Sequence, residues 1–408
     1  MKKKLFLAMS LAMGLFVVTS CSDDDNDGGN GGNPTINSNY DLAYSAENAT
    51  AWGNYMVRVA ELLRDDAATL YADWNSSYNG GASYASIFKS HNNDTYGSAL
   101  SCIEEIIDGC VTIADEVGDN KLGDPYDLYM QGNTTEALYA VESWYSWHSR
   151  DDYTNNIWSI RNAYFGSLDS TVNANSISAL VASVNTSLDE QMKTAILNAA
   201  AAIQAIPQPL RNNINSNETL EAMEACADLS AALSTLKKYI QDNLSDNAAL
   251  EGIIDTYVDD VILPTYQSLK EKNSDLYDAV VAFRSNPSNA AFETACHAWI
   301  EAREPWEKSE AFLFGPVDVE GLDPNMDSWP LDVDAIVQIL TTGNFGALDW
   351  DDDSEAEAAQ SVRGFHTLEF LLFQNGAPRT IELMVSIQSE QDVALTKWLP
   401  GCILIVCE

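Results

Sequence analysis

The sequence predicts an all-α fold built from helical bundles. Apolar residues recur every three or four positions through most of the chain, which is the spacing of one buried face of a helix. No stretch shows sustained alternation of apolar and polar residues between turn pairs, as the strands of a sheet would. Glycines and prolines divide the pattern into separate helical segments, so bundles of packed helices are the expected architecture.

Six segments carry the helical pattern most clearly: 52–74, 96–118, 188–206, 218–244, 253–286 and 286–315. The third segment stops at Pro207, because proline lacks the amide hydrogen that a helix interior needs. Pro264 predicts a kink in the fifth segment, and Pro305 lies inside the sixth. Three zones rich in glycine, proline, asparagine or acidic residues are expected to be irregular: 120–135, 315–334 and 343–355.

The first residues predict export of the chain. Three lysines and an apolar run form residues 1–20, which indicates a secretory signal. The small residues before Cys21 resemble a bacterial lipobox, which implies cleavage there and a lipid on Cys21; an ordinary signal peptide is the alternative. Residues 21–39 are acidic and rich in glycine and asparagine, which predicts a flexible tether. This run resembles the surface-export signal of Bacteroidota lipoproteins, so we expect an outer-membrane lipoprotein that lies either at the cell surface or in the periplasm.

The charge of the chain limits its partners. Its formal net charge is -40 at pH 7, and no cluster of lysine or arginine follows the first residues. This charge argues against binding of nucleic acid or of anionic membrane surfaces, and it is compatible with cation binding. With no second run long enough to cross a bilayer, the lipid is the expected membrane anchor.

The length predicts two domains after the tether. We place one helical bundle at 40–250 and a second at 251–379, and leave the tail 380–408 unassigned. The cysteines form no CxxC pair with nearby histidines, so a zinc finger or a thioredoxin-like site is not supported. We expect most of them to be buried thiols.

His366 and Glu369 are the first candidate site residues. They stand three positions apart in an apolar stretch, so they are neighbours on one face of a helix. An imidazole and a carboxylate placed in this way can share a divalent or trivalent cation, or they can form a hydrogen-bonded pair. The alternative is a buried histidine that is satisfied by its own glutamate.

A second segment repeats this spacing. Glu307 and Glu310 are three residues apart, and Arg303 lies one helical turn before Glu307. Metal-binding helical bundles combine carboxylates from one helix with Glu/His pairs from its neighbours. The alternative is a solvated helix face, but the apolar residues 312–314 that follow Glu310 favour burial. His148, with Asp151 and Asp152 one turn later, is expected to be a local pair on a helix face.

These residues carry a resemblance to a known family. The stretches AREPWEKSEAFLFGP, DSWPLD and GFHTLEFLLFQNGAPR resemble successive signatures of the imelysin family, including its GxHxxE motif, here Gly364 to Glu369. In that family these motifs come early, whereas here segments similar to its later part come first. The order predicts a circular permutation, in which 40–250 corresponds to the later part of the family and 251–379 to its earlier part. An internal duplication is the alternative.

The resemblance implies either a metal- or ligand-binding protein of iron uptake or a metallopeptidase. Zinc peptidases of the HExxH kind need two histidines four residues apart, and no second histidine lies within a turn of His366. Carboxylate-rich ligands suit a hard ion such as iron. We therefore predict binding of iron or another divalent or trivalent metal, or of a small iron-related ligand. Outer-membrane transport proteins are the expected partners.

The predicted site has a set of ligands and a set of supporting residues. The expected metal ligands are His366, Glu369, Glu307 and Glu310. The expected supporting residues are Arg303, Asp323, Asp327, Trp329, Asp332 and Gly364, of which the acidic ones lie in a loop at 318–334 that closes over the site. Two further alternatives stay open: the polar residues form a structural network inside the bundle, or they hold a ligand that is not a metal.

Overall fold

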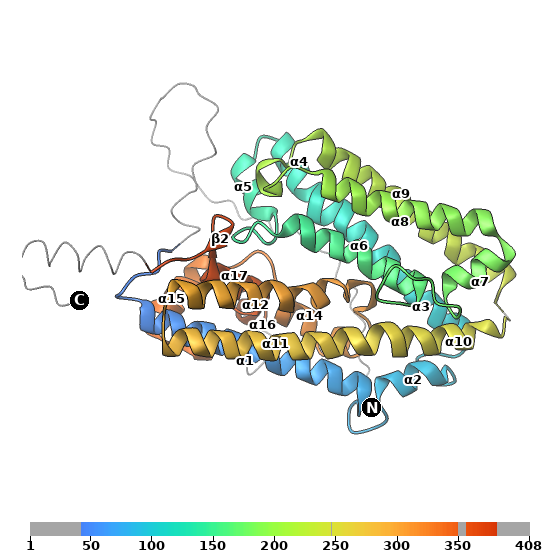
Figure 1. Cartoon of the computed structure of the whole chain (residues 1–408), viewed down its shortest axis with the longest axis horizontal. Coiled ribbons are helices and arrows are strands. Elements are labelled where there is room, and N and C mark those ends of the chain that lie inside the picture. Colours follow the sequence, from blue (N-terminus) through green and yellow to red (C-terminus); the bar gives the residue numbers. More distant parts are fainter. Residues whose placement is uncertain (1–41, 246, 350–355, 382–408) are drawn as a thin grey trace, which may run out of the picture. The chain divides into compact units, whose positions relative to one another are not determined.

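Two rings of four helices form the centre of the structure, which is a computed structural model that describes residues 42–245, 247–349 and 356–381 (Figure 1). One ring contains α1 (Ala49–Asn75), α11 (Leu263–Ser285), α12 (Asn289–Glu307) and α17 (Gly364–Leu372). The other ring contains α3 (Ala99–Asp115), α6 (Ser149–Phe165), α8 (Thr186–Ala205) and α9 (Asn217–Asn243). The predicted all-α class is confirmed, and a single pair of two-residue strands, β1 (Phe373–Gln374) and β2 (Ala377–Pro378), follows α17 in the described residues.

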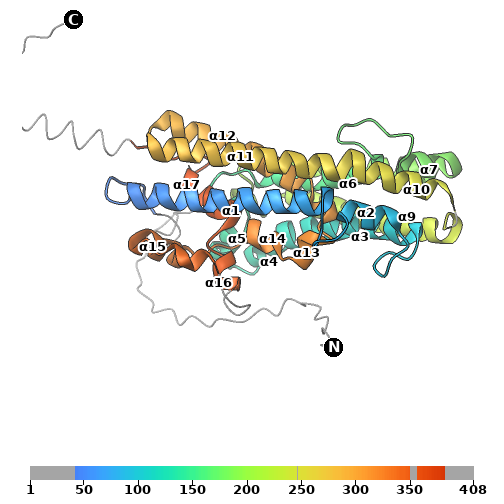
Figure 2. The same ribbon diagram turned by 90° about the horizontal axis from the view of Figure 1, so that it is seen from below.

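Shorter elements connect the long helices (Figure 2). On the N-terminal side they are α2 (Tyr84–Ser90), η2 (Glu116–Gly123), α4 (Asp124–Met130), α5 (Thr134–Ala140), α7 (Ile177–Val184) and η3 (Leu210–Asn212). On the C-terminal side they are α10 (Ala249–Thr256), η4 (Tyr257–Ile262), η5 (Glu310–Phe312), α13 (Pro316–Val319), α14 (Leu322–Met326), α15 (Val333–Thr342), η6 (Phe345–Leu348) and α16 (Ala356–Gln360). Of these, η2 and η4 are π-helical, and η3, η5 and η6 are 3₁₀ turns.

The zones predicted to be irregular contain helices in the structure. Residues 316–326 form α13 and α14, which are held by the burial of Val317, Leu322 and Met326. The zone at 120–135 continues α3 through η2 into α4. Sequence composition alone favours loops in both places, and packing of a few apolar side chains overrides it. Pro264 is the second residue of α11 and directly follows the π-helix η4, through which the helix runs on from α10, so the missing amide hydrogen falls beside a π-helical turn.

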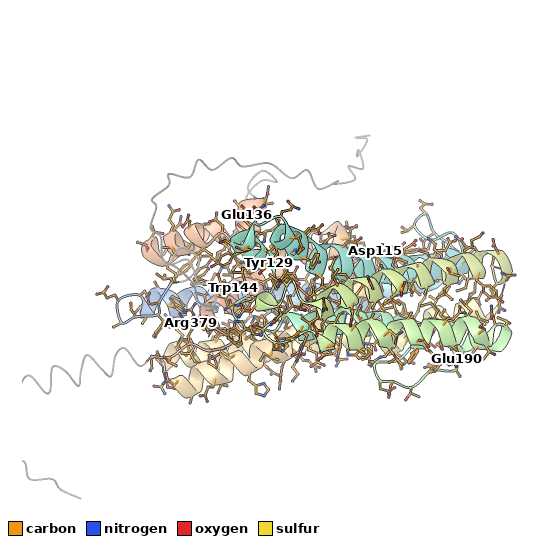
Figure 3. The ribbon with its side chains drawn as sticks, turned by 90° about the horizontal axis from the view of Figure 1, so that it is seen from above. Asp115, Tyr129, Glu136, Trp144, Glu190 and Arg379 are labelled. Carbon is orange, nitrogen blue, oxygen red and sulfur yellow. The ribbon has the colours of Figure 1, made fainter. Side chains whose placement is uncertain are left out.

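The boundary predicted near residue 250 does not separate the two rings. Helix α1 comes before that boundary, yet it packs along α11 and against α17, which come after it. The described residues belong to one compact unit, and one hydrophobic core runs through it from Tyr44 to Phe373. Exposed carboxylates such as Asp115 and Glu190 lie on the outer faces (Figure 3).

The two ends of the described chain meet at α17. Arg379 donates a hydrogen bond from Nη1 to the carbonyl of Leu42 at 2.9 Å and another from Nε to the carbonyl of Phe370 at 2.9 Å. Adjacent ends are what a circular permutation requires, and the permutation stays a prediction. None of the described helices combines the length and hydropathy needed to cross a bilayer. The predicted signal, tether and Cys21 lie outside the described residues, as does the tail after residue 381.

Candidate functional site

Helix α17 is the centre of the site, and every one of its residues is buried. Two indole groups hold it in place: Trp52 Nε1 on α1 donates to the carbonyl of Leu371 at 2.9 Å, and Trp299 Nε1 on α12 donates to the carbonyl of Phe365 at 3.0 Å. A helix enclosed on all sides explains why its polar residues find partners within the protein, because an unpaired buried polar group is costly.

Gly364 allows α14 to approach the start of α17. Its φ is +86°, and a Cβ atom there would lie 2.5 Å from the carbonyl oxygen of Met326. No side chain fits at that distance from backbone atoms. The missing side chain therefore sets the position of Asp327, the residue after Met326, opposite His366.

We expect Gly364→Ala to lower the free energy of unfolding by about 2–5 kcal/mol, from the positive φ and the clash together. The control is Gly343→Ala, where φ is also positive at +67° but an added Cβ meets nothing within 4 Å. It should cost only about 1–2 kcal/mol. Urea unfolding measures both variants, and equal losses would show that close packing against Met326 contributes nothing.

His366 and Glu369 bind each other and are completely buried. His366 Nδ1 lies 2.9 Å from Glu369 Oε2, and Nε2 lies 3.2 Å from Asp327 Oδ1. The other oxygen of Glu369, Oε1, accepts the backbone N–H groups of Tyr145 at 3.0 Å and Ser146 at 2.7 Å. Each polar atom of the His366–Glu369 pair thus has a partner within the protein.

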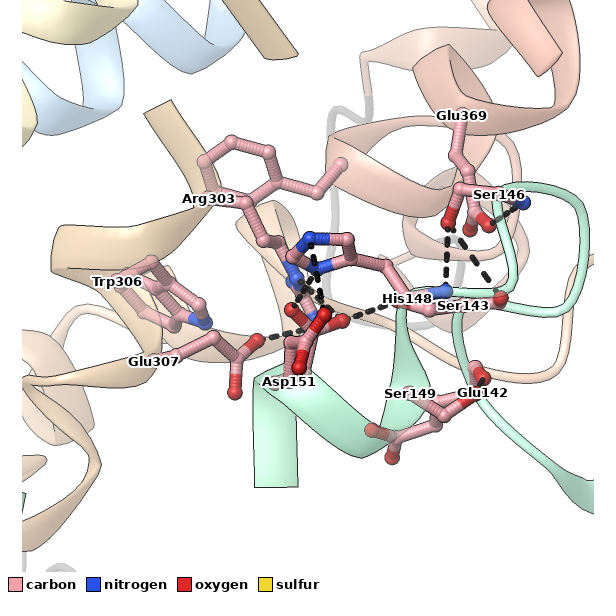
Figure 4. Close-up of polar contacts among 12 residues, drawn as sticks. Glu142, Ser143, Ser146, His148, Ser149, Asp151, Arg303, Trp306, Glu307 and Glu369 are labelled. Carbon is pink, nitrogen blue, oxygen red and sulfur yellow. Dashed lines mark hydrogen bonds and ion pairs between the residues drawn. The ribbon is translucent and has the colours of Figure 1, made fainter. Parts of the chain in front are cut away.

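Arg303 on α12 links the two helical rings, and its side chain has no exposed surface. Its guanidinium forms an ion pair with Asp327, and Nη2 lies 2.6 Å from Glu307 Oε1. Nη2 also lies 3.4 Å from His366 Nε2, and Nε lies 3.7 Å from Asp152 on α6. Figure 4 shows the guanidinium between Glu307 and the segment that carries His148. One buried cation therefore faces carboxylates from three separate segments.

Three carboxylates converge beside Arg303. Oxygen atoms of Glu307, Glu310 and Asp327 all lie within 4.8 Å of one another. Asn156 on α6 donates from Nδ2 to Glu307 Oε2 at 2.5 Å, and its own Oδ1 is buried without a hydrogen-bond partner in the described part of the chain. Carboxylate and amide oxygens are ligands that hard cations prefer. We define these four residues as the carboxylate cluster.

The surroundings hold Asp327 ionised and His366 protonated. Burial favours neutral Asp327, but Arg303 and His366 outweigh it and hold the pKa of Asp327 well below its usual range. Burial and Arg303 act to lower the pKa of His366, and hydrogen bonds with Asp327 and Glu369 overcome them and raise it to about 9. The pair is therefore an imidazolium facing a carboxylate, a charge-assisted contact stronger than a neutral one.

The pKa values of the other buried carboxyl groups are raised, in contrast to that of Asp327. Burial raises the pKa of Glu307 to about 8, although the charge of Arg303 opposes the rise. Burial also raises the pKa of Glu310 well above its usual value, against the charge of Lys121. The pKa of Asp323 rises to about 7 through burial and the nearby charge of Asp327. Burial is the main cause of these shifts, because it disfavours the ionised carboxylates, and a bound cation would favour the ionised forms.

The structure brings most of the predicted residues together. Glu307, Glu310, His366, Glu369 and Arg303 meet as described, and Asp327 joins them. Trp329 donates from Nε1 to the carbonyl of Tyr139 at 3.0 Å, and the centre of its ring lies 5.0 Å from that of His366. Asp323 lies in the first turn of α14. Asp332 instead caps α15, accepting the N–H of Ala335 at 2.9 Å, and it borders a surface cavity of about 480 Å³.

Sequence reasoning missed the contribution of α6 and the segment before it. His148 Nδ1 lies 2.9 Å from Asp152 Oδ1, as the local spacing predicted, but Asp152 also accepts from Ser143 Oγ at 2.5 Å and faces Arg303. The pair thus belongs to the buried site as well as to one helix. The i, i+4 spacing from His148 was the one sign of Asp152 in the sequence, and Asn156 carried none.

The fold and the site define an all-α protein whose two helical rings enclose an acid-rich polar cluster suited to a cation. The family model for imelysin, peptidase M75, matches residues 26–236 and 262–396. The chain therefore belongs to the imelysin family, as its motifs predicted.

Two relatives describe the match further. The crystal structure of an imelysin peptidase from Bacteroides ovatus has 62% sequence identity and a TM-score of 0.83, covering 84% of this chain and 100% of that chain. Iron-regulated protein A of Synechococcus elongatus is 32% identical over 161 residues, which are 38% of this chain and 41% of that protein. The chain thus matches about two fifths of the length of this curated relative.

Proposed function

We propose that this protein binds a metal cation, with iron as the physiological ion, through the carboxylates of Glu307, Glu310 and Asp327. The observation that carries the proposal is the convergence of three carboxylates within 4.8 Å of one another in the interior of the protein. Like charges brought so close repel unless a proton or a cation lies between them. The unpartnered Oδ1 of Asn156 adds an amide oxygen beside the same carboxylates.

His366 and Glu369 position this site in our proposal. The sequence suggested them as ligands, but Glu369 already accepts three hydrogen bonds and both nitrogens of His366 face carboxylates. Both nitrogens of the protonated His366 carry a hydrogen and have no lone pair for a metal, and Glu369 is not among the three carboxylates that lie within 4.8 Å of one another. The role of His366 and Glu369 is to fix Asp327 and to fasten the backbone at residues 145–146 to α17.

Iron is proposed from two independent considerations. Oxygen ligands suit hard ions such as ferric iron, and thiolates, which favour softer metals, take no part in the carboxylate cluster. The Synechococcus relative is named for its iron regulation. We also propose where the protein acts. Lipidation at Cys21 would hold it at the outer membrane, where it would supply iron to an outer-membrane transport protein. Loss of fatty-acid labelling in Cys21→Ser tests the anchor.

Peptidase activity is the second candidate, favoured by the name of the Bacteroides ovatus relative. A catalytic metal needs an open coordination position for water and a general base nearby. In that case Glu310, with its raised pKa, would act as the base instead of as a metal ligand. This candidate requires metal-dependent cleavage of an unstructured polypeptide.

A protein-interaction module with a purely structural polar network would neither cleave nor bind metal.

We expect the full chain to bind ferrous iron, measured by anaerobic calorimetry, and the Glu307→Gln and Glu310→Gln variants to bind it at least about tenfold more weakly. Each variant removes one charged ligand while keeping the shape of the side chain. The matched control is Glu304→Gln, because Glu304 lies on the same helix but is exposed and pairs with Lys308. Manganese, calcium and zinc are titrated beside iron. No binding by the folded wild type would overturn the proposal, and chelator-sensitive cleavage of casein would favour the peptidase.

A further inference from the structure

A cavity of about 310 Å³ lies between α11 and α12, which pack side by side (Figure 2). The residues that matter for its chemistry lie on one face of each helix. They are Thr265 and Lys272 on α11, Glu301, Glu304 and Pro305 on α12, and Lys308 directly after α12. Arg303 and Glu307 lie on the opposite face of α12, so this cavity is separate from the carboxylate cluster.

Thr265 brings an unpaired hydroxyl group to the cavity wall. The residue is only 3% exposed, and its Oγ1 is buried without a hydrogen-bond partner in the part of the chain that the structure describes. A threonine inside a helix usually donates to the carbonyl four residues earlier, as Thr235 and Thr294 do at 2.9 Å. For Thr265 that carbonyl belongs to Val261 in the π-helix η4, and no such bond forms. Because an unpaired buried hydroxyl is costly, the cavity suits a polar occupant.

Pro305 frees a second polar group beside the cavity. It lies inside α12 and has no amide hydrogen, so the carbonyl of Glu301 one turn earlier lacks its usual partner in the helix. Both residues line the cavity, and Ser268 adds another hydroxyl one turn after Thr265. The wall thus offers hydroxyl donors and a carbonyl acceptor to a bound molecule.

Two ion pairs border the same cavity. Lys272 Nζ lies 2.5 Å from Glu301 Oε2, and Lys308 pairs with Glu304. These four side chains are between 25% and 53% exposed, and ion pairs of exposed groups contribute little to stability, so a ligand can open one at small cost. A molecule with one charge of each sign can enter such a pair and leave neither partner alone, whereas a simple anion or cation leaves one group unpaired.

We propose that this cavity binds a small zwitterion with an aliphatic body, which is the chemistry of a free aliphatic amino acid. Helices α11 and α12 form an antiparallel hairpin, so Thr265 lies toward Lys308 while Lys272 lies toward Glu301. The ligand enters the pair between Lys308 and Glu304. Its carboxylate binds Lys308 and accepts the Thr265 hydroxyl, and its ammonium binds Glu304 and the free carbonyl of Glu301.

The size and the edge of the cavity fit this class of ligand. A volume of 310 Å³ corresponds to about ten water molecules, which is room for one amino acid of medium size. Leu168, which follows α6, lines the cavity and is 41% exposed, so it offers apolar surface to an aliphatic side chain. The proposal is independent of the metal site.

Calorimetry on the full chain with three related probes tests the ligand class. The probes are L-leucine, 4-methylpentanoate, which lacks the ammonium group, and 3-methylbutylamine, which lacks the carboxylate. We expect L-leucine to bind the wild type with a Kd below about 1 mM and each of the other two to bind at least about tenfold more weakly, because each loses one charge-assisted contact.

Three variants test the position of the site. Thr265→Val removes the hydroxyl and keeps the shape of the side chain, while Lys308→Met and Glu304→Gln each remove one charge. Each should weaken the binding of L-leucine by about tenfold. The matched control is Lys238→Met, since Lys238 pairs with Asp242 at 2.9 Å on the surface of α9 and should not affect binding. Circular dichroism establishes folding, and Thr265→Ala is measured in case the valine variant does not fold.

Every outcome bears on the proposal. If the folded wild type binds none of the three probes, the cavity holds water only and the proposal is overturned. Equal binding of L-leucine and either singly charged probe would overturn the zwitterion class, and unchanged binding in the folded Thr265, Lys308 and Glu304 variants would overturn the site. Glu304→Gln also separates the two proposals, because it should weaken the binding of L-leucine and leave the binding of iron unchanged.

Discussion

Arg303→Met should lower the free energy of unfolding by about 3–5 kcal/mol at neutral pH, because removing one partner of a buried ion network leaves the others without neutralisation. Methionine keeps the volume and the apolar stem, so the loss reports on charge and hydrogen bonding rather than on a cavity. Asp327 loses its ion pair, and Glu307 loses a contact of 2.6 Å. Neither carboxylate is open to solvent, since the side chain of Glu307 is fully buried and that of Asp327 is 5% exposed.

Urea unfolding measures this effect, and Arg284→Met is the matched control. Arg284 lies near the end of α11 and donates one exposed hydrogen bond to Asn54, so its loss should stay within about 1 kcal/mol. The proposed cation site adds a second expectation. Added Ca²⁺ should raise the melting temperature of Arg303→Met by more degrees than that of the wild type, because the ion replaces the missing charge. Similar stability of the two arginine variants would show that the carboxylates are solvated.

The second large effect is a loss of stability as the pH rises. The pKa of His366 is about 9 in the folded protein, against about 6.5 for an exposed histidine. The folded state therefore holds a proton that the unfolded state has lost within this interval. This stabilisation, about 3 kcal/mol, is fully present below pH 6.5 and disappears as the pH passes through 9.

Glu307 and His148 also make the folded protein less stable as the pH rises. The raised pKa of Glu307, about 8, means that its folded carboxyl also keeps a proton which the unfolded chain releases near pH 4.5. The pKa of His148 is raised to about 9, because Asp152 and Asp151 outweigh burial. Asp327 affects the stability at low pH. Its pKa is lowered, so the stability that it adds is lost only in strong acid. The metal-free protein should thus be less stable at pH 9 than at pH 6.

Unfolding of His366→Gln across pH 6 to 9 tests this assignment. Glutamine can still donate to Glu369 but cannot carry the proton, so the variant should be less stable than the wild type at pH 6 and should show a flatter profile. His297→Gln is the control, since His297 is exposed on α12 and its replacement should leave the profile unchanged. A wild-type profile that is flat between pH 6.5 and 9 would contradict a protonated His366.

The sequence by itself determined the helices and the pairs within them. Apolar spacing located α1, α8 and α9 closely, because a helix face repeats every three to four residues wherever it packs. The same geometry gave the bond between His366 and Glu369 and the ion pair between Arg303 and Glu307. Their atoms meet within one or two turns, so no knowledge of the rest of the fold is needed.

Only the tertiary packing determines which groups of other helices these two pairs contact. Asp152 and Asn156 lie more than 140 residues before Arg303 in the sequence, and they reach the site because α6 packs beside η5 and α12. Glu369 is held by the backbone N–H groups of Tyr145 and Ser146, and a backbone contact of this kind cannot be predicted from the residue types. Local spacing fixes neighbours along one helix. Which helices face one another is set by the burial of apolar surface over the whole chain, and that burial turned two pairs at helical spacing into one enclosed, acid-rich site.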